Sequence, residues 1–226
     1  MVNIYSISIK QHDCPHTFVT SRIHDLTIFI MNTIDYSKKY QKTLSIFYSK
    51  TAEDLKYTIK TLNEYGDLKD LEVLGMGPTT MSLMYSFPKT AAYKWVSKIG
   101  FRMHPILVKN GEERWFLVSN ESQSVKEIEE ELNDSNTSTL RVKKLSTNNF
   151  ISEYSELFSD VWKVRIDSAV GPEVFNILTQ ALAQGFYDWP RKSSLSELSR
   201  NIKMPRSTLT YRLRKLERLV FRDIGK

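Results

Sequence analysis

Towards its C-terminal end the chain places apolar residues at three- and four-residue steps, the spacing of helices that are buried on one side. Three such segments lie between positions 175 and 220. The first is expected to bury Phe175, Leu178, Leu182 and Phe186. Gly185 stands where a left-handed residue commonly ends a helix. The pattern therefore predicts a short helical domain at this end of the chain.

The second segment has a local start signal. Ser194, with Glu197 three residues later, forms a capping box. The helix that follows is expected to bury Leu195, Leu198 and Ile202. A tight turn at Lys203-Met204 leads into the third helix, where Pro205 is predicted at the first position. The third helix has an apolar stripe of Leu209, Leu213, Leu216 and Val220.

The third helix carries its polar residues away from that stripe. Helix-turn-helix proteins place such a face in the major groove of DNA. The residues predicted to contact base edges are Arg206, Ser207, Thr210, Tyr211 and Arg214. Those better placed for phosphates are Arg191, Arg212 and Arg218.

The motifs of this region resemble a known family. They are Gly185-Phe-Tyr-Asp-Trp-Pro-Arg191, Leu195-Ser-Glu-Leu198, Arg206-Ser-Thr-Leu209 and Leu213-Arg-Lys-Leu-Glu-Arg218. Together they look like the helix-turn-helix of bacterio-opsin-activator-type transcription regulators, over about residues 172–221. The resemblance implies an archaeal DNA-binding regulator. Similar sequences usually have Gly where Lys203 stands and Ser where Pro205 stands, so Lys203 is expected to be mildly strained at positive φ.

Trp189, at the end of Phe186-Tyr-Asp-Trp, is predicted to be buried beneath the three helices. Truncating a buried tryptophan costs about 3–5 kcal/mol. On this interpretation its replacement by alanine would unfold the C-terminal domain.

Charge supports a nucleic-acid partner. Residues 191–226 hold eleven Lys or Arg against three acids, a net +8, whereas the whole chain is +6 and residues 1–190 therefore sum to −2. A basic segment on a nearly neutral body is the electrostatic footprint of phosphate binding. The alternative is a solvated basic helix without a partner.

Composition bounds the remaining possibilities. The 226 residues are 41% apolar and 12% aromatic, enough for packed cores. A single cysteine fits a reducing cytoplasm, and the apolar runs are too short for a bilayer. We expect a cytoplasmic protein with no membrane partner.

The first 145 residues predict an α+β fold built on an antiparallel sheet with packed helices. Strands are expected at 2–10, 25–34, 43–48, 70–74, 81–87, 102–108 and 114–119, and helices at 51–65 and 90–98. Asn110-Gly111 indicates a hairpin.

A weak internal echo links two parts of this region. The segments around Ile46, Leu55, Leu62 and Leu71 recur about 70 residues later around Phe116, Val125, Leu132 and Leu140. The echo favours duplicated ferredoxin-like or ACT-like units at about 1–78 and 79–145. Amphipathic periodicity alone would produce a similar match.

A cluster of metal-ligand residue types follows the first strand. His12, Cys14 and His16 have spacings of two, and imidazole and thiolate suit zinc, copper or iron. The favoured interpretation is a loop with a buried thiol and two exposed imidazoles, without metal. A catalytic Cys-His pair ranks lowest, because no third orienting group is identifiable.

Between the two regions, residues 148–165 have an apolar stripe at helical spacing, with Asn149 expected as the cap. The stripe comprises Phe150, Tyr154, Leu157, Phe158, Val161 and Trp162. It could dock within the chain or pair with a second copy. The expected organisation is an α+β sensor or dimerisation region (1–145), a connector helix (146–170) and a helix-turn-helix domain (171–226).

The sequence thus predicts a non-enzymatic, sequence-specific transcription regulator that binds double-stranded DNA as a homodimer and needs no cofactor. Its N-terminal region is expected either to sense an unidentified small-molecule or metal effector or to serve dimerisation. A first alternative is a metal- or small-molecule-binding, even enzymatic, domain around Cys14 that is tethered to DNA. A second is an RNA-binding or structural nucleoid protein that uses the basic tail.

Overall fold

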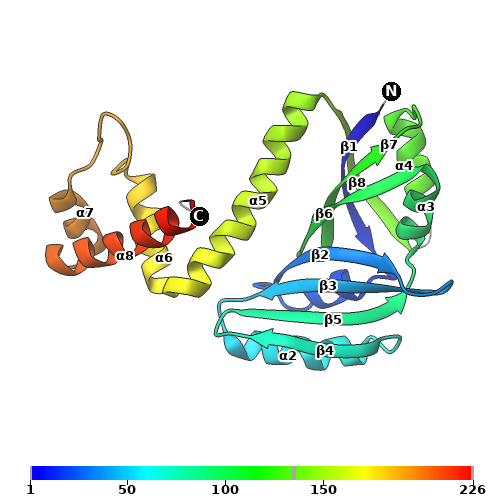
Figure 1. Ribbon diagram of the computed structural model, residues 1–226, viewed down its shortest axis with the longest axis horizontal. Helices are drawn as coiled ribbons and strands as arrows, with labels where there is room; N and C mark the ends of the chain where they lie inside the picture. Colours follow the sequence, from blue (N-terminus) through cyan, green and yellow to red (C-terminus); the bar gives the residue numbers. More distant parts are fainter. Residues whose placement is uncertain (1, 134–135, 225–226) are drawn as a thin grey trace. The chain divides into compact units, whose positions relative to one another are not determined.

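The computed structural model describes residues 2–133 and 136–224, which divide into two compact units, Met1–Val161 and Trp162–Lys226. The first half of the sheet region consists of β1 (Asn3–Gln11), α1 (Pro15–Thr20), β2 (Thr27–Asp35), β3 (Tyr40–Tyr48), α2 (Ala52–Glu64) and β4 (Lys69–Met76) (Figure 1). The second half consists of β5 (Thr80–Pro88), α3 (Ala91–Ile99), β6 (Gly100–Lys109), β7 (Glu112–Ser119), α4 (Val125–Leu132) and β8 (Thr137–Leu145). The chain continues through α5 (Thr147–Val170), α6 (Pro172–Ala183), α7 (Leu195–Ile202) and α8 (Arg206–Ile224).

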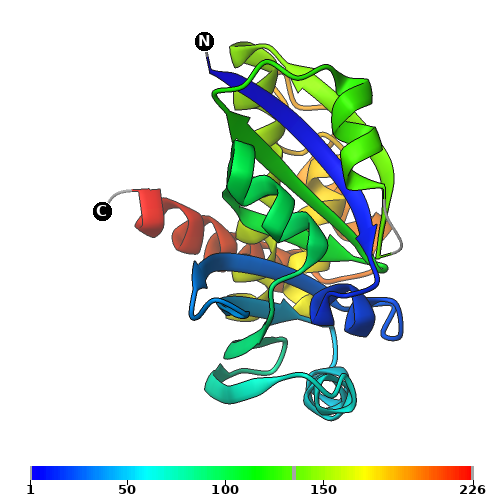
Figure 2. The same ribbon diagram turned by 90° about the vertical axis from the view of Figure 1, so that its right-hand side faces the viewer.

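The first unit is built on one eight-stranded sheet in the order β4-β5-β3-β2-β6-β7-β1-β8. Neighbouring strands pair antiparallel, from β4·β5 at one edge to β1·β8 at the other. Figures 1 and 2 show the sheet strongly twisted, so that β1 runs steeply across the direction of β2. The α+β fold class and the antiparallel sheet expected from the sequence are confirmed.

The sheet has an internal two-fold pattern. Each strand of the first half has a counterpart four strands later in the chain: β1 with β5, β2 with β6, β3 with β7 and β4 with β8. When every strand is replaced by its counterpart, the result is the same strand order read from the opposite edge of the sheet. The symmetry axis of this pattern lies between β2 and β6. Each half of the chain also has the same βαββαβ order of elements.

The halves exchange their first strands. β5 lies between β3 and β4 of the first half, while β1 lies between β7 and β8 of the second. Each half therefore contributes a split βαβ, β3-α2-β4 or β7-α4-β8, that is completed by a strand of the other half. The exchange ties the two halves into one sheet.

One face of the sheet holds the main core. Residues from α1, α2, α3 and α4 pack there against the inward side chains of the strands. The start of α5 covers the part of the opposite face that is formed by β6, β7 and β8. Because successive strand residues point to opposite faces, Trp115 lies in the main core while Phe116 packs beneath Phe150 and Tyr154. Intramolecular packing thus accounts for part of the connector stripe.

Local sequence signals set most boundaries. The side chains of Thr51, Thr90 and Ser124 each cap a helix by accepting from a backbone N–H three residues on. Asn110 and Gly111 both have positive φ (52° and 74°) in the hairpin between β6 and β7.

Two local predictions were wrong. The segment after β1 is the helix α1, not a loop, and the imidazole of His16 is fully buried. The connector helix begins at Thr147, so Asn149 lies inside it. The N–H of Asn149 instead donates to Ser146 Oγ over 3.3 Å.

Candidate nucleic-acid interface

The second unit has its own core. Seven buried residues from α6, α7, α8 and the loop after α6 form it: Ile177, Ala181, Phe186, Leu198, Leu209, Leu213 and Leu216. The stripe predicted for the first helix was only partly right, because Leu182 is 56% exposed. The apolar residues of α6 allow two stripes, and contact with α7 and α8 selects the one through Ile177 and Ala181. The side chain of Val220 lies outside the described part of the chain.

The end of α6 has the expected left-handed glycine. Gly185 has φ +69°, and the N–H groups of Gly185 and Phe186 donate to carbonyls of Leu182 and Ala181. Such bonds satisfy the last carbonyls of a helix. A Cβ at Gly185 would lie 2.8 Å from Lys192 Cβ, so the position also requires glycine for space.

The turn between α7 and α8 has the predicted geometry, with a positive φ at Lys203, where similar sequences usually have glycine. Ser194 and Glu197 form the complete capping box at the start of α7. At its end, Lys203 takes the left-handed conformation with φ 56° and ψ 43°. The Met204 N–H donates to Ser199 O, and Ser199 Oγ donates back to Met204 O over 2.6 Å.

Pro205 lies one position earlier than predicted. Helix α8 begins at Arg206, and the Pro205 carbonyl accepts from the Leu209 N–H. Pro205 is therefore the N-cap residue. A proline cap offers no side-chain acceptor to the first free N–H groups of the helix.

The polar residues of α8 are accessible. Tyr211 is 70% exposed, and Arg206, Ser207 and Arg214 are exposed. Thr210 is half-buried, and its hydroxyl donates to the Arg206 carbonyl. Four of the five residues predicted to contact base edges thus present free side-chain surface on one helix.

The three residues predicted to contact phosphates differ from one another. Arg191 and Arg218 are exposed, and the Arg191 guanidinium lies 4.7 Å from the centre of the Phe186 ring. Arg212 is only 24% exposed in its side chain and forms an ion pair with Glu173 of α6. Binding a phosphate would require Arg212 to leave a contact that joins two helices.

Trp189 contradicts its prediction. The side chain is 96% exposed and lies in the loop between α6 and α7. Phe186 fills the space beneath the helices, with 6% exposure. Tyr187 next to it donates from its hydroxyl to Glu217 of α8, and burial raises the pKa of that hydroxyl. The loop is thus anchored by its two other aromatic residues, and the indole is free to contact a partner.

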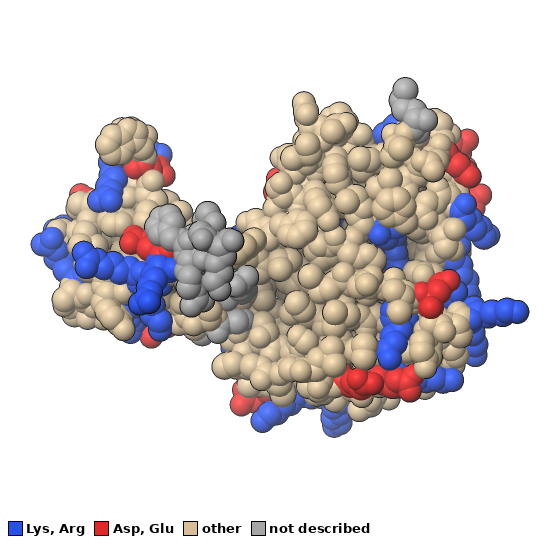
Figure 3. All heavy atoms as spheres, in the orientation of Figure 1, with Lys and Arg blue, Asp and Glu red and all other residues tan. Residues whose placement is uncertain are grey.

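Cations gather on the helical unit. Figure 3 shows several Lys and Arg side chains close together on the part of the molecule that carries α6 to α8. Exposed Arg206, Arg214 and Arg218 lie along α8, which gives the accessible side of this helix a positive charge. A polyanion is the partner that such a surface favours.

A second cluster of candidate residues lies in the first unit. Cys14 and His16 are both buried, with 3.4 Å between Cys14 Sγ and His16 Nδ1. His12 is exposed and does not join them. The third member is Glu113 of β7, which sequence reasoning missed because it is far away in the chain.

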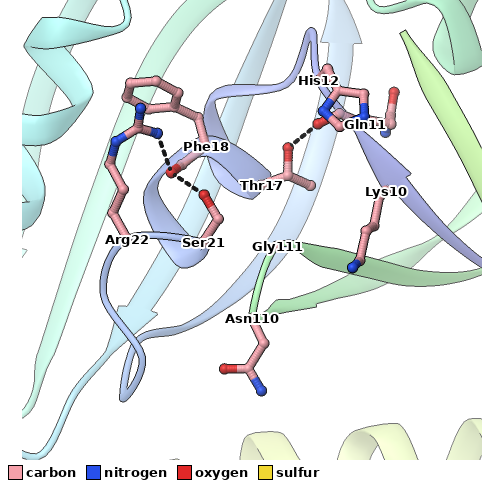
Figure 4. A pocket seen from close by; sticks show the side chains of 9 residues that line it. All are labelled: Lys10, Gln11, His12, Thr17, Phe18, Ser21, Arg22, Asn110 and Gly111. Atoms are coloured by element: carbon pink, nitrogen blue, oxygen red, sulfur yellow. Dashed lines mark hydrogen bonds between the residues drawn. The ribbon is translucent and has the colours of Figure 1, made fainter. Parts of the chain in front are cut away.

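Beside this cluster is a cavity of about 340 Å³, formed by the end of β1, α1 and the Asn110-Gly111 hairpin (Figure 4). Lys10, Gln11 and Arg22 are among the residues that line it.

Within the described part of the chain, no helix is both long and apolar enough to cross a membrane.

Two family models match the chain. The HVO_2525_N model, which describes an N-terminal domain, matches residues 4–138, from β1 into β8. The chain belongs to this family. A model described as an HTH DNA binding domain matches residues 174–222, from α6 into α8. No curated protein and no solved structure matches the chain.

The second match confirms the resemblance to bacterio-opsin-activator-type regulators. The protein carries a helix-turn-helix DNA-binding domain that follows an α+β N-terminal domain in the sequence, which indicates a DNA-binding regulator.

Proposed function

We propose that the protein is a sequence-specific transcription regulator that inserts α8 into the major groove of double-stranded DNA. The observation that carries the proposal is the exposed polar face at the start of α8, above a helix-turn-helix core. Arginine reads guanine through two hydrogen bonds, and a hydroxyl can bond to several bases. Arg206, Ser207, Tyr211 and Arg214 have these side chains in accessible positions.

The remaining predicted contacts rank below these four. Thr210 needs a rotation of its hydroxyl away from the Arg206 carbonyl before it can bond to a base. Arg191 and Arg218 are free to bind phosphates, whereas Arg212 is held by Glu173. We therefore expect Arg212→Ala to weaken the packing of α6 against α8 more than it weakens DNA binding.

Trp189 joins the interface in this proposal. It is exposed on the same unit as the basic helix α8, and it lies two residues before the exposed Arg191 in the sequence. Aromatic residues and arginine are enriched in the surfaces through which proteins contact one another. Its contact is expected to add affinity without base preference.

A double substitution tests the docking mode. Arg206→Ala/Arg214→Ala removes two charges and two base contacts, so binding to the preferred site should fall by about 1–3 kcal/mol per contact. Lys56→Ala/Lys60→Ala removes the same charge from the exposed side of α2 and serves as the matched control. Fluorescence anisotropy with specific and scrambled duplexes would measure both. Equal losses in the two variants would refute the docking mode.

We also propose that the regulator binds as a homodimer and that α5 contributes to the interface. Ile151 and Phe158 are 57% and 40% exposed. Their spacing of seven residues places them on one side of the helix, apart from the residues that pack on the sheet. A second copy of the same stripe would cover them, and a dimer would double the length of DNA that is read.

Sedimentation tests the dimer. The wild-type protein at micromolar concentration should have twice the 26.4 kDa chain mass, and Phe158→Glu should shift it towards the monomer. Tyr57→Glu, at an aromatic residue that is 50% exposed on α2, is the control and should remain dimeric. A wild-type protein of single-chain mass would overturn this part of the proposal.

A further inference from the structure

Three side chains with metal-binding atoms meet inside the first unit. The ligand atoms of Cys14, His16 and Glu113 all lie within 4.8 Å of one another. Their exposed fractions are 2%, 0% and 1%. Acidic groups gather on many protein surfaces, but a thiol, an imidazole and a carboxyl converging in the interior need a specific explanation.

The fold brings these residues together from two places. Cys14 is the N-cap residue of α1, and its side chain makes no capping hydrogen bond, so the sulfur is left to face the interior. His16 lies in the first turn of α1. Glu113 is on β7, paired with Ile9 of β1 just before the chain enters α1.

Two of the three groups already have the spacing of ligands to one ion. In a tetrahedral site with a metal–sulfur bond of 2.3 Å and a metal–nitrogen bond of 2.0–2.1 Å, the sulfur and nitrogen lie about 3.6 Å apart. The observed separation of Cys14 Sγ and His16 Nδ1 is 3.4 Å. The Glu113 carboxyl lies within 4.8 Å of both and would move towards the ion to complete the site.

Hydrogen bonds outside the cluster hold two of the three groups in place. His16 Nε2 lies 3.1 Å from Ser45 Oγ, which leaves Nδ1 directed at Cys14. Gln11 Nε2 donates to Glu113 Oε2 over 2.6 Å. Metal-binding histidines and carboxylates characteristically have such outer partners, which fix their orientation.

Burial acts on all three groups. It raises the pKa of the Cys14 thiol and of the Glu113 carboxyl and lowers the pKa of His16 to about 3, while the nearby Arg102 guanidinium favours the charged carboxylate of Glu113. A divalent cation bound to the sulfur would stabilise the thiolate form of Cys14.

We propose that Cys14 Sγ, His16 Nδ1 and the Glu113 carboxylate together bind one divalent transition-metal ion of the zinc class. Sulfur and imidazole nitrogen select such ions over Mg²⁺ and Ca²⁺, which prefer oxygen. Binding releases the thiol proton, together with any proton on the Glu113 carboxyl, to solvent and leaves one coordination position for water. Gln11 Oε1 is buried without a hydrogen-bond partner among the described residues, so a bound water would meet an acceptor there.

Gln11 links the cavity in Figure 4 to the cluster. Its side chain lines the cavity and also donates to Glu113. The site joins α1 to β7, so an ion would cross-link two elements of the sheet unit, whether or not the C-terminal domain binds DNA.

Cobalt titration of the purified full-length protein tests the proposal. After treatment with a chelator and exchange into metal-free buffer, the chain should bind one Co²⁺ and develop sulfur-to-cobalt charge-transfer absorption in the near ultraviolet. The sequence has one cysteine, so this absorption by itself identifies Cys14 as a ligand. Zn²⁺ should displace the cobalt and abolish the absorption, and Mg²⁺ should not.

Variants locate the other ligands. His16→Ala and Glu113→Gln should each weaken Co²⁺ binding at least tenfold, whereas His12→Ala, at the exposed neighbouring imidazole, should bind as the wild type does. Stability gives a second readout, because an ion that binds only the folded chain raises its melting temperature. The proposal would be overturned if the wild-type protein showed no charge-transfer absorption. It would also be overturned if His12→Ala lost the absorption to the same extent as His16→Ala and Glu113→Gln. The wild-type titration decides the question even where a variant fails to fold.

Discussion

Lys203 is held in a conformation that suits glycine, so Lys203→Gly should stabilise the helix-turn-helix. Its φ of 56° and ψ of 43° are those of the left-handed region, which costs a residue with a Cβ about 1–2 kcal/mol. Glycine avoids that cost but loses about 0.5–1 kcal/mol more backbone entropy on folding. The net gain should be about 0.5–1 kcal/mol.

The surroundings of Lys203 leave the turn intact after the change. Its side chain is exposed, and the backbone bonds of the turn, Lys203 N–H to Arg200 O and Met204 N–H to Ser199 O, do not depend on it. Lys203→Ala removes the same charge but keeps the Cβ. It therefore separates backbone strain from the loss of the lysine side chain.

Hydrogen exchange of the full-length protein can measure the difference where it arises. A gain of about 0.5–1 kcal/mol corresponds to about two- to fivefold slower exchange of amides in α7 and α8 that open with the domain. Lys203→Ala should show no slowing. Equal exchange in Lys203→Gly and Lys203→Ala would refute the assignment of strain to this turn.

Three further outcomes follow from the packing. Trp189→Ala should leave the free energy of unfolding in urea within about 0.5 kcal/mol of wild type, because the indole is 96% exposed, while it weakens DNA binding; a loss of several kcal/mol would mean that the ring is buried. Gly185→Ala should destabilise the second unit by more than about 1 kcal/mol. Alanine in the left-handed conformation costs about 1–2 kcal/mol, and the new Cβ would also clash with Lys192 Cβ at 2.8 Å. An unchanged melting temperature would contradict the packing of this loop. Burial, with Arg102 nearby, lowers the pKa of His104 to about 4 from an ordinary 6.5, so the unfolded chain gains its proton first and stability falls as the pH drops from 6.5 to 4. This contribution is about 2 kcal/mol at pH 5, and urea unfolding of His104→Asn should show a correspondingly smaller loss between pH 7 and pH 5 than wild type does.

Short-range signals were enough to predict much of this molecule. Residues within one or two helical turns of each other determine three local features. These are the capping box of Ser194 and Glu197, the left-handed conformation of Gly185 and the positive φ of Lys203. The hairpin at Asn110-Gly111 is likewise determined by its own two residues, which readily adopt the positive φ angles that the turn requires. Tertiary contacts do not oppose these preferences, so the local prediction holds.

Other features depend on partners that are distant in the sequence. The pairing of β1 with β7 and β8, and of β5 with β3 and β4, joins opposite halves of the chain, and no local pattern encodes which strand completes which half. The place of Glu113 beside Cys14 depends on the same pairing. The sequence could suggest the thiol and the imidazole, but not the carboxyl that the fold adds.

Burial of single aromatic residues was the least reliable expectation. Phe186 and Trp189 are three residues apart in one motif, and hydrophobicity alone favours both for the interior. The Gly185 turn directs Phe186 inwards, and Tyr187 ties the loop to α8 through Glu217. The space beneath the helices is then filled, and Trp189 is left in solvent.

The central claim is that α8 reads DNA sequence. The most direct measurement is to select duplexes from a random library with the purified full-length protein and to sequence those that it retains. We expect an enriched half-site repeated with two-fold symmetry, at a spacing of about one helical turn, and its loss or change in Arg206→Ala/Arg214→Ala but not in Lys56→Ala/Lys60→Ala. Retention of DNA with no enriched sequence, or the same sequence enriched by both double variants, would contradict it.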